Sequence, residues 1–351
     1  MNSEFINKSD ERWHAVKEVK DHDFYHLPEY VALDSKLTNG TPVCWVAETA
    51  EFRAWIPLIK RRIPDCISKG KNYFDLTSPY GFSGILFDVQ PEPYELNRLI
   101  WKFNKDAARN NYITSFLRMN PISNPFTWQQ NDLIEQVYHG YTITVPLNNR
   151  FETIRKGYSS NHKKNIKQLQ REGFIFSMDT KECCKAFIPI YEETMNRLNA
   201  SKYYFFPEKY FEILFKILGS NIHLAMVYDK CGNPAAGGII TDFNGILQSH
   251  LTATRTSYLR DAPSKLLFDG VIKWAANSGR KWLHLGGGLN SKEDSLYRFK
   301  KGFSSIKNQF STLHIIHDKQ RYNNLNYVAL NEGGKKEFED PDFFPLYRQF
   351  S

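Results

Sequence analysis

Residues 221–288 read NIHLAMVYDKCGNPAAGGIITDFNGILQSHLTATRTSYLRDAPSKLLFDGVIKWAANSGRKWLHLGGG, and this stretch decides the fold. Three apolar runs in it predict strands, and Asn244-Gly245 between the second and third is typical of a β-hairpin. Pro263 and Ser264 then open a segment whose apolar residues recur at helical spacing. A last apolar run comes directly before three glycines. The predicted order is hairpin, strand, helix, strand.

The first half of the chain repeats this order without repeating the sequence. Residues 42–61 are typical of a hairpin, and residues 72–87 form an extended stretch interrupted by glycines. Residues 93–111 have the apolar periodicity of a helix, and residues 112–119 that of a strand. The sequence therefore predicts an α/β protein with two similar lobes.

Composition limits the classes of function. The chain has 351 residues, 41% of them hydrophobic, and a net charge of +8, which favours anionic partners such as nucleic acid, phosphorylated metabolites or a membrane surface. Five cysteines without a CxxC pair argue against a disulfide framework or a zinc site and indicate the cytoplasm. The sequence shows no secretory signal and no apolar run of about 18 residues. We expect no metal and no tightly bound cofactor.

A basic segment joins the two predicted lobes. Residues 150–173 read RFETIRKGYSSNHKKNIKQLQREG, with seven cationic side chains against two glutamates, and predict a basic linker helix. Its lysines, including Lys163 and Lys164, suit the phosphates of tRNA or an anionic membrane. A solvated basic helix explains the same pattern.

At this level the chain resembles the FemABX-like branch of the GNAT superfamily, and specifically members associated with surface polysaccharides. The resemblance rests on short motifs that follow one another in family order over nearly the whole chain. They are FYHLPEYV, PLIKRRI, DLTSPYGFSGIL, NHKKNIKQLQREG, SHLTATRTSYLRDAPSKLL, LHLGGG…DSLYRFKKGFS and FFPLYRQ.

The resemblance implies a fold and a reaction. The fold is two tandem GNAT-like lobes, each a mixed, mostly antiparallel sheet flanked by helices. The first lobe would span residues 1–146, with 313–351 returning to it, and the second 147–312. The reaction is acyl or aminoacyl transfer to an amine of a cell-envelope glycan precursor on a nucleotide or lipid carrier. The donor would be aminoacyl-tRNA or acyl-CoA, the protein a monomer, and its place the cytoplasm or the inner membrane face.

The motif LHLGGGLNSKEDSLYRFKKGFSS, residues 283–305, is the strongest site candidate. Lys300 and Arg298 suit the phosphates of the nucleotide or lipid carrier that bears the acceptor. The resemblance further implies that Lys300 contacts the activated acceptor and steadies the oxyanion, because positive charge stabilises an anion that develops at the acyl carbon. Lys301 is a weaker candidate for binding these phosphates. The alternative is a solvated helix face. Three glycines offer backbone N–H groups to an anion or simply form a turn: Gly286, Gly287 and Gly288.

The motif RDAPSKLL occupies the place where ordinary GNAT enzymes carry a glycine-rich turn for the CoA pyrophosphate. Pro263 and Ser264 stand where those enzymes have glycines, and Pro263 has no N–H to donate. Ser264 and Lys265 remain candidates for donor phosphate, and an ordinary helix start is the alternative. The departure argues against simple acetyl-CoA use.

Three further residues are candidates with structural alternatives. Tyr80, in SPYGFSG, would stack on or bond a sugar or base, or belong to a bulged strand. Asp88 would be a proton acceptor. His250, one strand away from the glycines, would take the proton from the attacking ammonium or be a packed histidine.

Two rival functions remain open at this stage. One is an acetyl-CoA-dependent sugar N-acetyltransferase on the same fold. The other is a catalytically inert RNA- or membrane-binding protein, favoured by the +8 charge and the basic linker.

Overall fold

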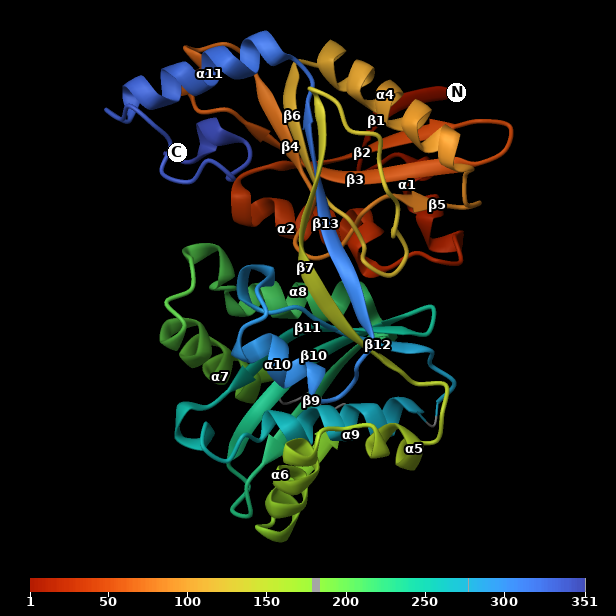
Figure 1. Ribbon diagram of the computed structural model, residues 1–351, viewed down its shortest axis with the longest axis vertical. Helices are drawn as coiled ribbons and strands as arrows, with labels where there is room; N and C mark the ends of the chain where they lie inside the picture. Colours follow the sequence, from red (N-terminus) through yellow and green to blue (C-terminus); the bar gives the residue numbers. More distant parts are fainter. Residues whose placement is uncertain (179–183, 277, 351) are drawn as a thin grey trace. The chain divides into compact units, whose positions relative to one another are not determined.

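The computed structural model describes residues 1–178, 184–276 and 278–350. Cys183, one member of the adjacent pair with Cys184, lies outside the described residues. The chain divides into two compact units, residues 1–139 with 310–351 and residues 140–309 (Figure 1). Strands β7 (Ile134–Pro146) and β13 (Lys307–Ile316) each contribute residues to both units.

The sheet of the first unit has the strand order β1-β2-β3-β4-β6-β13. All neighbours are antiparallel except β4 and β6, which α4 connects. The bounds are β1 Asn2–Asn7, β2 Thr41–Glu48, β3 Arg53–Arg62, β4 Phe74–Thr77, β5 Leu86–Phe87, β6 Tyr112–Arg118, α1 Glu11–His14, α2 Pro28–Ser35, α3 Asp65–Ser68, α4 Pro93–Arg109 and α11 Lys319–Glu332.

The core of the first unit lies between its sheet and α4. Leu96, Leu99, Ile100 and Phe103 recur at helical spacing on α4 and are buried against strand residues such as Trp45. The opposite face of α4 is exposed, so the helix is amphipathic and covers one side of the sheet.

The C-terminal tail packs on this same unit. Arg348 Nε donates to Asp75 Oδ2 over 2.7 Å, and a second guanidinium nitrogen donates to the Arg62 carbonyl over 2.7 Å. Tyr347 is fully buried, with its hydroxyl 2.8 Å from Thr114 Oγ1.

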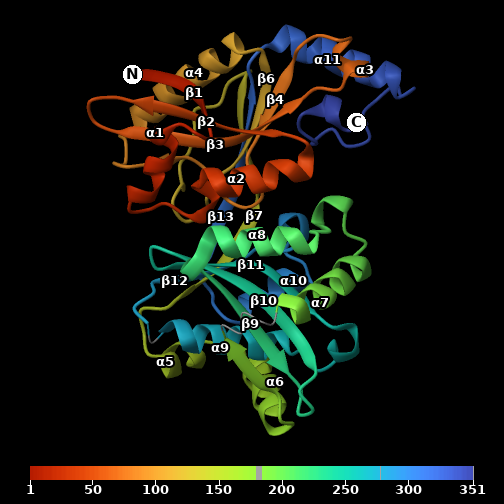
Figure 2. The ribbon, with the colours of Figure 1, turned by 180° about the vertical axis from the view of Figure 1, so that it is seen from behind.

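The sheet of the second unit has the order β7-β12-β11-β10-β9-β8. Figure 2 shows β9, β10, β11 and β12 of this sheet. Again a single pair is parallel among these strands, β11 with β12, and a helix, α9, connects it. The bounds are α5 Phe151–Lys156, α6 Ser160–Arg171, β8 Ile175–Met178, α7 Cys184–Arg197, α8 Glu208–Leu218, β9 Ile222–Tyr228, β10 Pro234–Phe243, β11 Ile246–Thr254, α9 Ser264–Ala276, β12 Trp282–Gly286 and α10 Ser295–Lys301.

Both units therefore follow the predicted order of hairpin, strand, helix, strand. Asn244 and Gly245 form the β10–β11 turn with φ of 53° and 80°, the left-handed values that this dipeptide favours. Successive glycines on β10 face opposite sides of the sheet. A Cβ on Gly237 would meet Phe187 of α7 at 2.7 Å, and one on Gly238 would meet Leu267 of α9 at 3.3 Å. The glycines let helices approach both faces closely.

The basic segment differs from the single helix predicted for it. The structure has α5 and α6 instead, separated at Gly157–Ser159. Ser159 caps α6 by accepting a hydrogen bond from the His162 N–H over 3.2 Å. Ser159 is a preferred N-cap residue, and capping here starts a second helix.

Candidate functional site

Helix α10 starts directly after the glycine turn and carries the cations predicted for the site. Asp294 caps it, accepting from the Tyr297 N–H over 2.8 Å and from the Leu289 N–H over 3.0 Å. Burial would raise the pKa of Asp294, but these N–H groups and the charge of Lys300 lower it below its ordinary value. The carboxylate thus stays ionised and fixes the start of α10 against the turn.

Lys300 points at the glycine turn, residues 286–288. Its Nζ donates to the Gly287 carbonyl over 2.6 Å. Desolvation lowers the pKa of Lys300 to about 8, although the Asp294 charge opposes this shift. At neutral pH the side chain is therefore mainly a cation, and it loses its proton more easily than an exposed lysine does.

The glycines of the turn are required by close packing. Gly286 has a φ of 75°, and a Cβ there would lie 3.3 Å from Lys300 Nζ. A Cβ on Gly288 would lie 2.0 Å from the Lys292 carbonyl oxygen and 2.4 Å from Asp294 Oδ1. The turn can be this tight because the side chains are absent.

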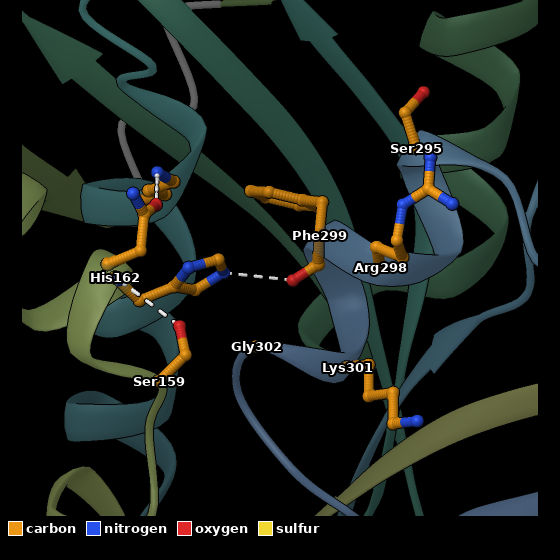
Figure 3. A pocket seen from close by; sticks show the side chains of 9 residues that line it. Ser159, His162, Ser295, Arg298, Phe299, Lys301 and Gly302 are labelled. Carbon is orange, nitrogen blue, oxygen red and sulfur yellow. Dashed lines mark hydrogen bonds between the residues drawn. The ribbon is translucent and has the colours of Figure 1, made fainter.

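A second group of residues lines an open pocket of about 460 Å³ within the second unit (Figure 3). We call it the basic pocket. Its lining comes from the start of α6, the start of α9 and one side of α10. The lining residues are Ser159, Asn161, His162, Lys265, Ser295, Arg298, Phe299, Lys301 and Gly302.

Three cationic residues line the basic pocket. Arg298 and Lys301 lie three residues apart on α10, hence on the same helix face, and both are exposed. Lys265 is buried, and its Nζ donates to Asn161 Oδ1 and Asn165 Oδ1, each over 2.6 Å. Burial lowers the pKa of Lys265. The lining residues include no carboxylate, and the start of α6 adds its positive dipole end.

His162 joins α6 to α10 at the base of the basic pocket (Figure 3). Its Nε2–H donates to the Phe299 carbonyl over 2.9 Å, and its ring lies 4.5 Å from that of Phe303. Burial lowers the pKa of His162 to about 4, so the imidazole is neutral at physiological pH. Gly302 faces this ring, and a Cβ there would lie 2.4 Å from it.

A pair of buried polar residues, His284 and Gln248, includes one close enough to feel the charge of Lys300. His284 on β12 has Nδ1 2.7 Å from Gln248 Oε1 on β11. Burial and the charge of Lys300 lower the pKa of His284 to about 3. The sequence pattern did not predict these two residues as part of the site, because each lies inside an apolar strand pattern.

The sequence pattern also did not predict a site role for Ser159, Asn161 or His162. A serine before a basic periodic segment is nevertheless a recognisable helix cap.

Other predicted site residues lie outside the basic pocket's lining. Lys163 Nζ donates to the Lys156 carbonyl over 3.0 Å, and Lys164 is exposed on α6. Ser264 Oγ lies 2.5 Å from Thr254 Oγ1, at the start of α9. His250 on β11 is buried, which lowers its pKa to about 3 and makes it a weak base.

Tyr80 and Asp88 belong to the first unit. The Tyr80 N–H donates to Asp34 Oδ2 over 2.8 Å, and its carbonyl accepts from the Tyr30 hydroxyl over 2.7 Å. Asp88 accepts from the Arg53 N–H over 2.7 Å and from Arg53 Nε over 2.8 Å. Burial would raise the pKa of Asp88, but the bonds from Arg53 and Val89 lower it, which weakens its basicity.

Comparison with known proteins identifies the fold and the enzyme class. Residues 156–301 match the family described as acetyltransferase (GNAT) domain. The structure of FemX is similar with a TM-score of 0.66, at 12% sequence identity, over 92% of this chain and 99% of that chain. A search of curated protein sequences gave no match.

Two further solved structures share the fold. The C-terminal domain of a putative lysylphosphatidylglycerol synthetase from Agrobacterium fabrum has a TM-score of 0.54 at 11% identity, covering 93% of this chain and 97% of that chain. L-PGS from Bacillus licheniformis has a TM-score of 0.54 at 13% identity, with 89% and 93% covered. The predicted FemABX-like fold of two GNAT-like lobes is thus confirmed, and the GNAT domain makes the protein an acyltransferase. The described residues contain no helix long and apolar enough to cross a membrane.

Proposed function

We propose that this acyltransferase attaches an acyl or aminoacyl group to an amine of a cell-envelope glycan precursor, and that the basic pocket holds the phosphates of the donor. The acceptor is an amino sugar or peptide on a nucleotide or lipid carrier. The observation that carries the proposal is that Lys265, Arg298 and Lys301 line one pocket together with the start of α6, and that the same helix α10 carries Lys300.

The pocket's chemistry suits a phosphorylated donor. Arg298 offers a planar guanidinium and Lys301 a point charge. The lining residues include no carboxylate that would neutralise either cation. Lys265 is held in place by two amide oxygens, so it presents a fixed charge rather than a mobile one. A helix start next to these cations favours an anion further.

Lys300 supports the chemical step. The acceptor amine attacks the donor's carbonyl carbon, a C–N bond forms, and the carbonyl oxygen becomes an anion. The Lys300 ammonium stabilises that oxyanion. The C–S or C–O bond to the leaving group then breaks, and the leaving group takes the proton that the amine loses. The Gly287 carbonyl orients the ammonium in the resting enzyme.

The preferred donor is aminoacyl-tRNA, and the alternative donor is acyl-CoA. The exposed basic face of α6, with Lys164 and Lys167, favours tRNA, because it adds positive charge near the positively charged basic pocket. Pro263 argues against the glycine-rich turn that binds the CoA pyrophosphate in ordinary GNAT enzymes, because proline has no N–H to donate to the pyrophosphate. An acetyl-CoA-dependent sugar N-acetyltransferase is therefore the second candidate. In either case the protein acts as a monomer, in the cytoplasm or at the inner membrane face.

The test is a transfer assay read by mass spectrometry. Donors are acetyl-CoA and a charged-tRNA mixture, and acceptors are UDP-linked amino sugars and muropeptides. A new amide on an acceptor, absent with Lys300→Met and retained with the surface control Lys216→Met, is the expected result. Salt-dependent tRNA binding without any product would contradict the proposal and favour an inert RNA-binding protein.

A further inference from the structure

The first unit carries a second pocket, unrelated in chemistry to the basic pocket. It has a volume of about 230 Å³ and lies where α4 meets the segment that follows β6. We call it the tryptophan pocket. Its lining residues are Asn97, Ile100, Trp101, Trp128, Gln129, Asn131 and Ile134.

Trp101 is placed for a ligand rather than for the core. Its side chain is 59% exposed, whereas Ile100 and Phe103 on the same helix are buried in the core. Lys105 Nζ lies 4.9 Å from the centre of the Trp101 ring, over one of its faces. A large exposed aromatic surface at the edge of a pocket is a typical stacking platform.

Trp128 supplies a buried donor with no acceptor. The residue is 3% exposed, and its indole Nε1–H has no hydrogen-bond partner among the described residues. Leaving a buried donor unpaired costs about 1–3 kcal/mol, and buried polar groups in folded proteins are rarely left so. Trp128 lines the tryptophan pocket, so a ligand oxygen that displaces the atoms covering this N–H would remove the cost.

The pocket is held in shape by the chain itself. Asn97 Oδ1 accepts from the Gln129 N–H over 3.2 Å, and Gln136 Oε1 accepts from the Trp128 N–H over 3.0 Å. Asn131 Oδ1 accepts from the Leu133 N–H over 2.9 Å. These bonds fasten the segment to α4 and to β7, so binding a ligand requires little ordering of the backbone.

The lining residues named above carry no formal charge, which sets the class of ligand. The lining residues offer a phosphate or carboxylate no cationic partner, and Lys105, whose ammonium lies over the Trp101 ring, is not among them; a neutral ring with one apolar face and several hydroxyls suits the site. The volume lies below the roughly 300–1,000 Å³ of sites for drug-sized ligands, so one small ring fits better than a long chain.

We propose that the tryptophan pocket binds a neutral pyranose ring of a saccharide. The ring's apolar face stacks on Trp101, and one of its oxygens accepts the Trp128 indole N–H. Hydroxyl groups bond to the side-chain amides of Asn97 and Gln129, which are exposed. The proposal stands on the first unit alone and does not depend on the transfer reaction, so each can fail separately.

The test is titration of the full-length protein, labelled with ¹⁵N in its tryptophan indoles, with neutral disaccharides at millimolar concentration. The probes are N,N′-diacetylchitobiose, maltose and lactose, with inorganic phosphate as the charged comparison. Loss of one cross-peak in Trp128→Phe assigns the Trp128 indole. We expect at least one disaccharide, and not phosphate, to shift that peak saturably.

Matched variants on α4 make the result specific. Trp101→Ala should weaken saccharide binding about tenfold, as expected for loss of a stacking aromatic. Tyr94→Ala, which removes another exposed aromatic of the same helix outside the pocket, should leave binding unchanged. Trp128→Phe keeps the packing, and if its melting temperature is retained, binding should fall about fivefold for one lost hydrogen bond.

Three outcomes would overturn the proposal. One is no saturable shift with any disaccharide. Another is equal binding by the Trp101→Ala variant and the unmodified protein. The third is binding to anionic lipid vesicles that Trp101→Ala and Tyr94→Ala weaken equally, without saccharide binding, because the exposed face of α4 would then be a membrane contact.

Discussion

Lys300 Nζ lies 2.6 Å from the carbonyl oxygen of Gly287, so the lysine of α10 is bonded to the turn that precedes its own helix. Asp294, between the two, caps α10 and keeps the turn closed. The cation is thereby fixed at the turn that follows β12. This relationship gives Lys300 a lowered pKa and a defined direction.

The first prediction concerns stability against pH. The pKa of Lys300 is about 8 in the folded protein and 10.5 ordinarily, so the unfolded state binds more protons between these values. The contribution of Lys300 to the free energy of unfolding therefore rises with pH from about 8 to 10.5. Urea unfolding at several pH values should show the unmodified protein gaining stability relative to Lys300→Met across this window. Parallel curves would contradict the assigned burial of the ammonium.

The second prediction concerns catalysis by Lys300. Once a donor and acceptor are found, Lys300→Met should lower kcat/KM about 10²-fold, the effect typical of losing one oxyanion donor. The unmodified enzyme should lose activity as pH rises through about 8, because the ammonium is deprotonated. Lys300→Arg should keep part of the activity and move this loss to higher pH. An unchanged alkaline limb in Lys300→Arg would assign it to another group.

The third prediction concerns charge in the basic pocket. Arg298→Gln and Lys301→Gln should each raise the donor's Kd about tenfold and make donor binding less sensitive to salt, because each removes a phosphate partner. The control is Lys216→Gln on α8, which removes an exposed lysine that does not line the pocket. Equal effects of all three substitutions would mean that only the net charge matters.

The fourth prediction concerns the contact between α6 and α10. A methyl group on Gly302 would meet the His162 ring at 2.4 Å, and this buried ring has little room to move. Gly302→Ala should lower the free energy of unfolding by about 1–3 kcal/mol and weaken donor binding as the pocket widens. Gly157→Ala is the matched control, since its nearest contact would be 3.3 Å and its φ is −71°. If both variants have the same free energy of unfolding, α6 can move away from α10 without cost, and the predicted close contact would be wrong.

Local patterns predicted much of the fold. The Asn244-Gly245 hairpin and the helix that begins at Ser264 were readable because turn and helix-start preferences act within a few residues. The same patterns gave the repeated order of elements. The basic segment was predicted as one helix because its charges are continuous, while the cap at Ser159 divides it.

The candidate site was less predictable, because it depends on contacts between distant segments. Asn161 and Asn165 accept hydrogen bonds from Lys265, which lies 104 and 100 residues further along the chain. His162 contacts Phe299 across 137 residues. No local periodicity encodes such pairs. The predicted cations were found from charge and family resemblance, whereas the neutral residues that position them came from the structure alone.

The most direct test is thermal stabilisation by donors, which needs no known acceptor. A ligand that binds only the folded state raises Tm by mass action. The account predicts that acetyl-CoA, CoA or charged tRNA raises the Tm of the unmodified protein and of Lys216→Gln, and fails to raise that of the double variant Lys265→Gln, Arg298→Gln. An undiminished shift in the double variant, or no shift with any of these donors, would contradict a donor site in the basic pocket.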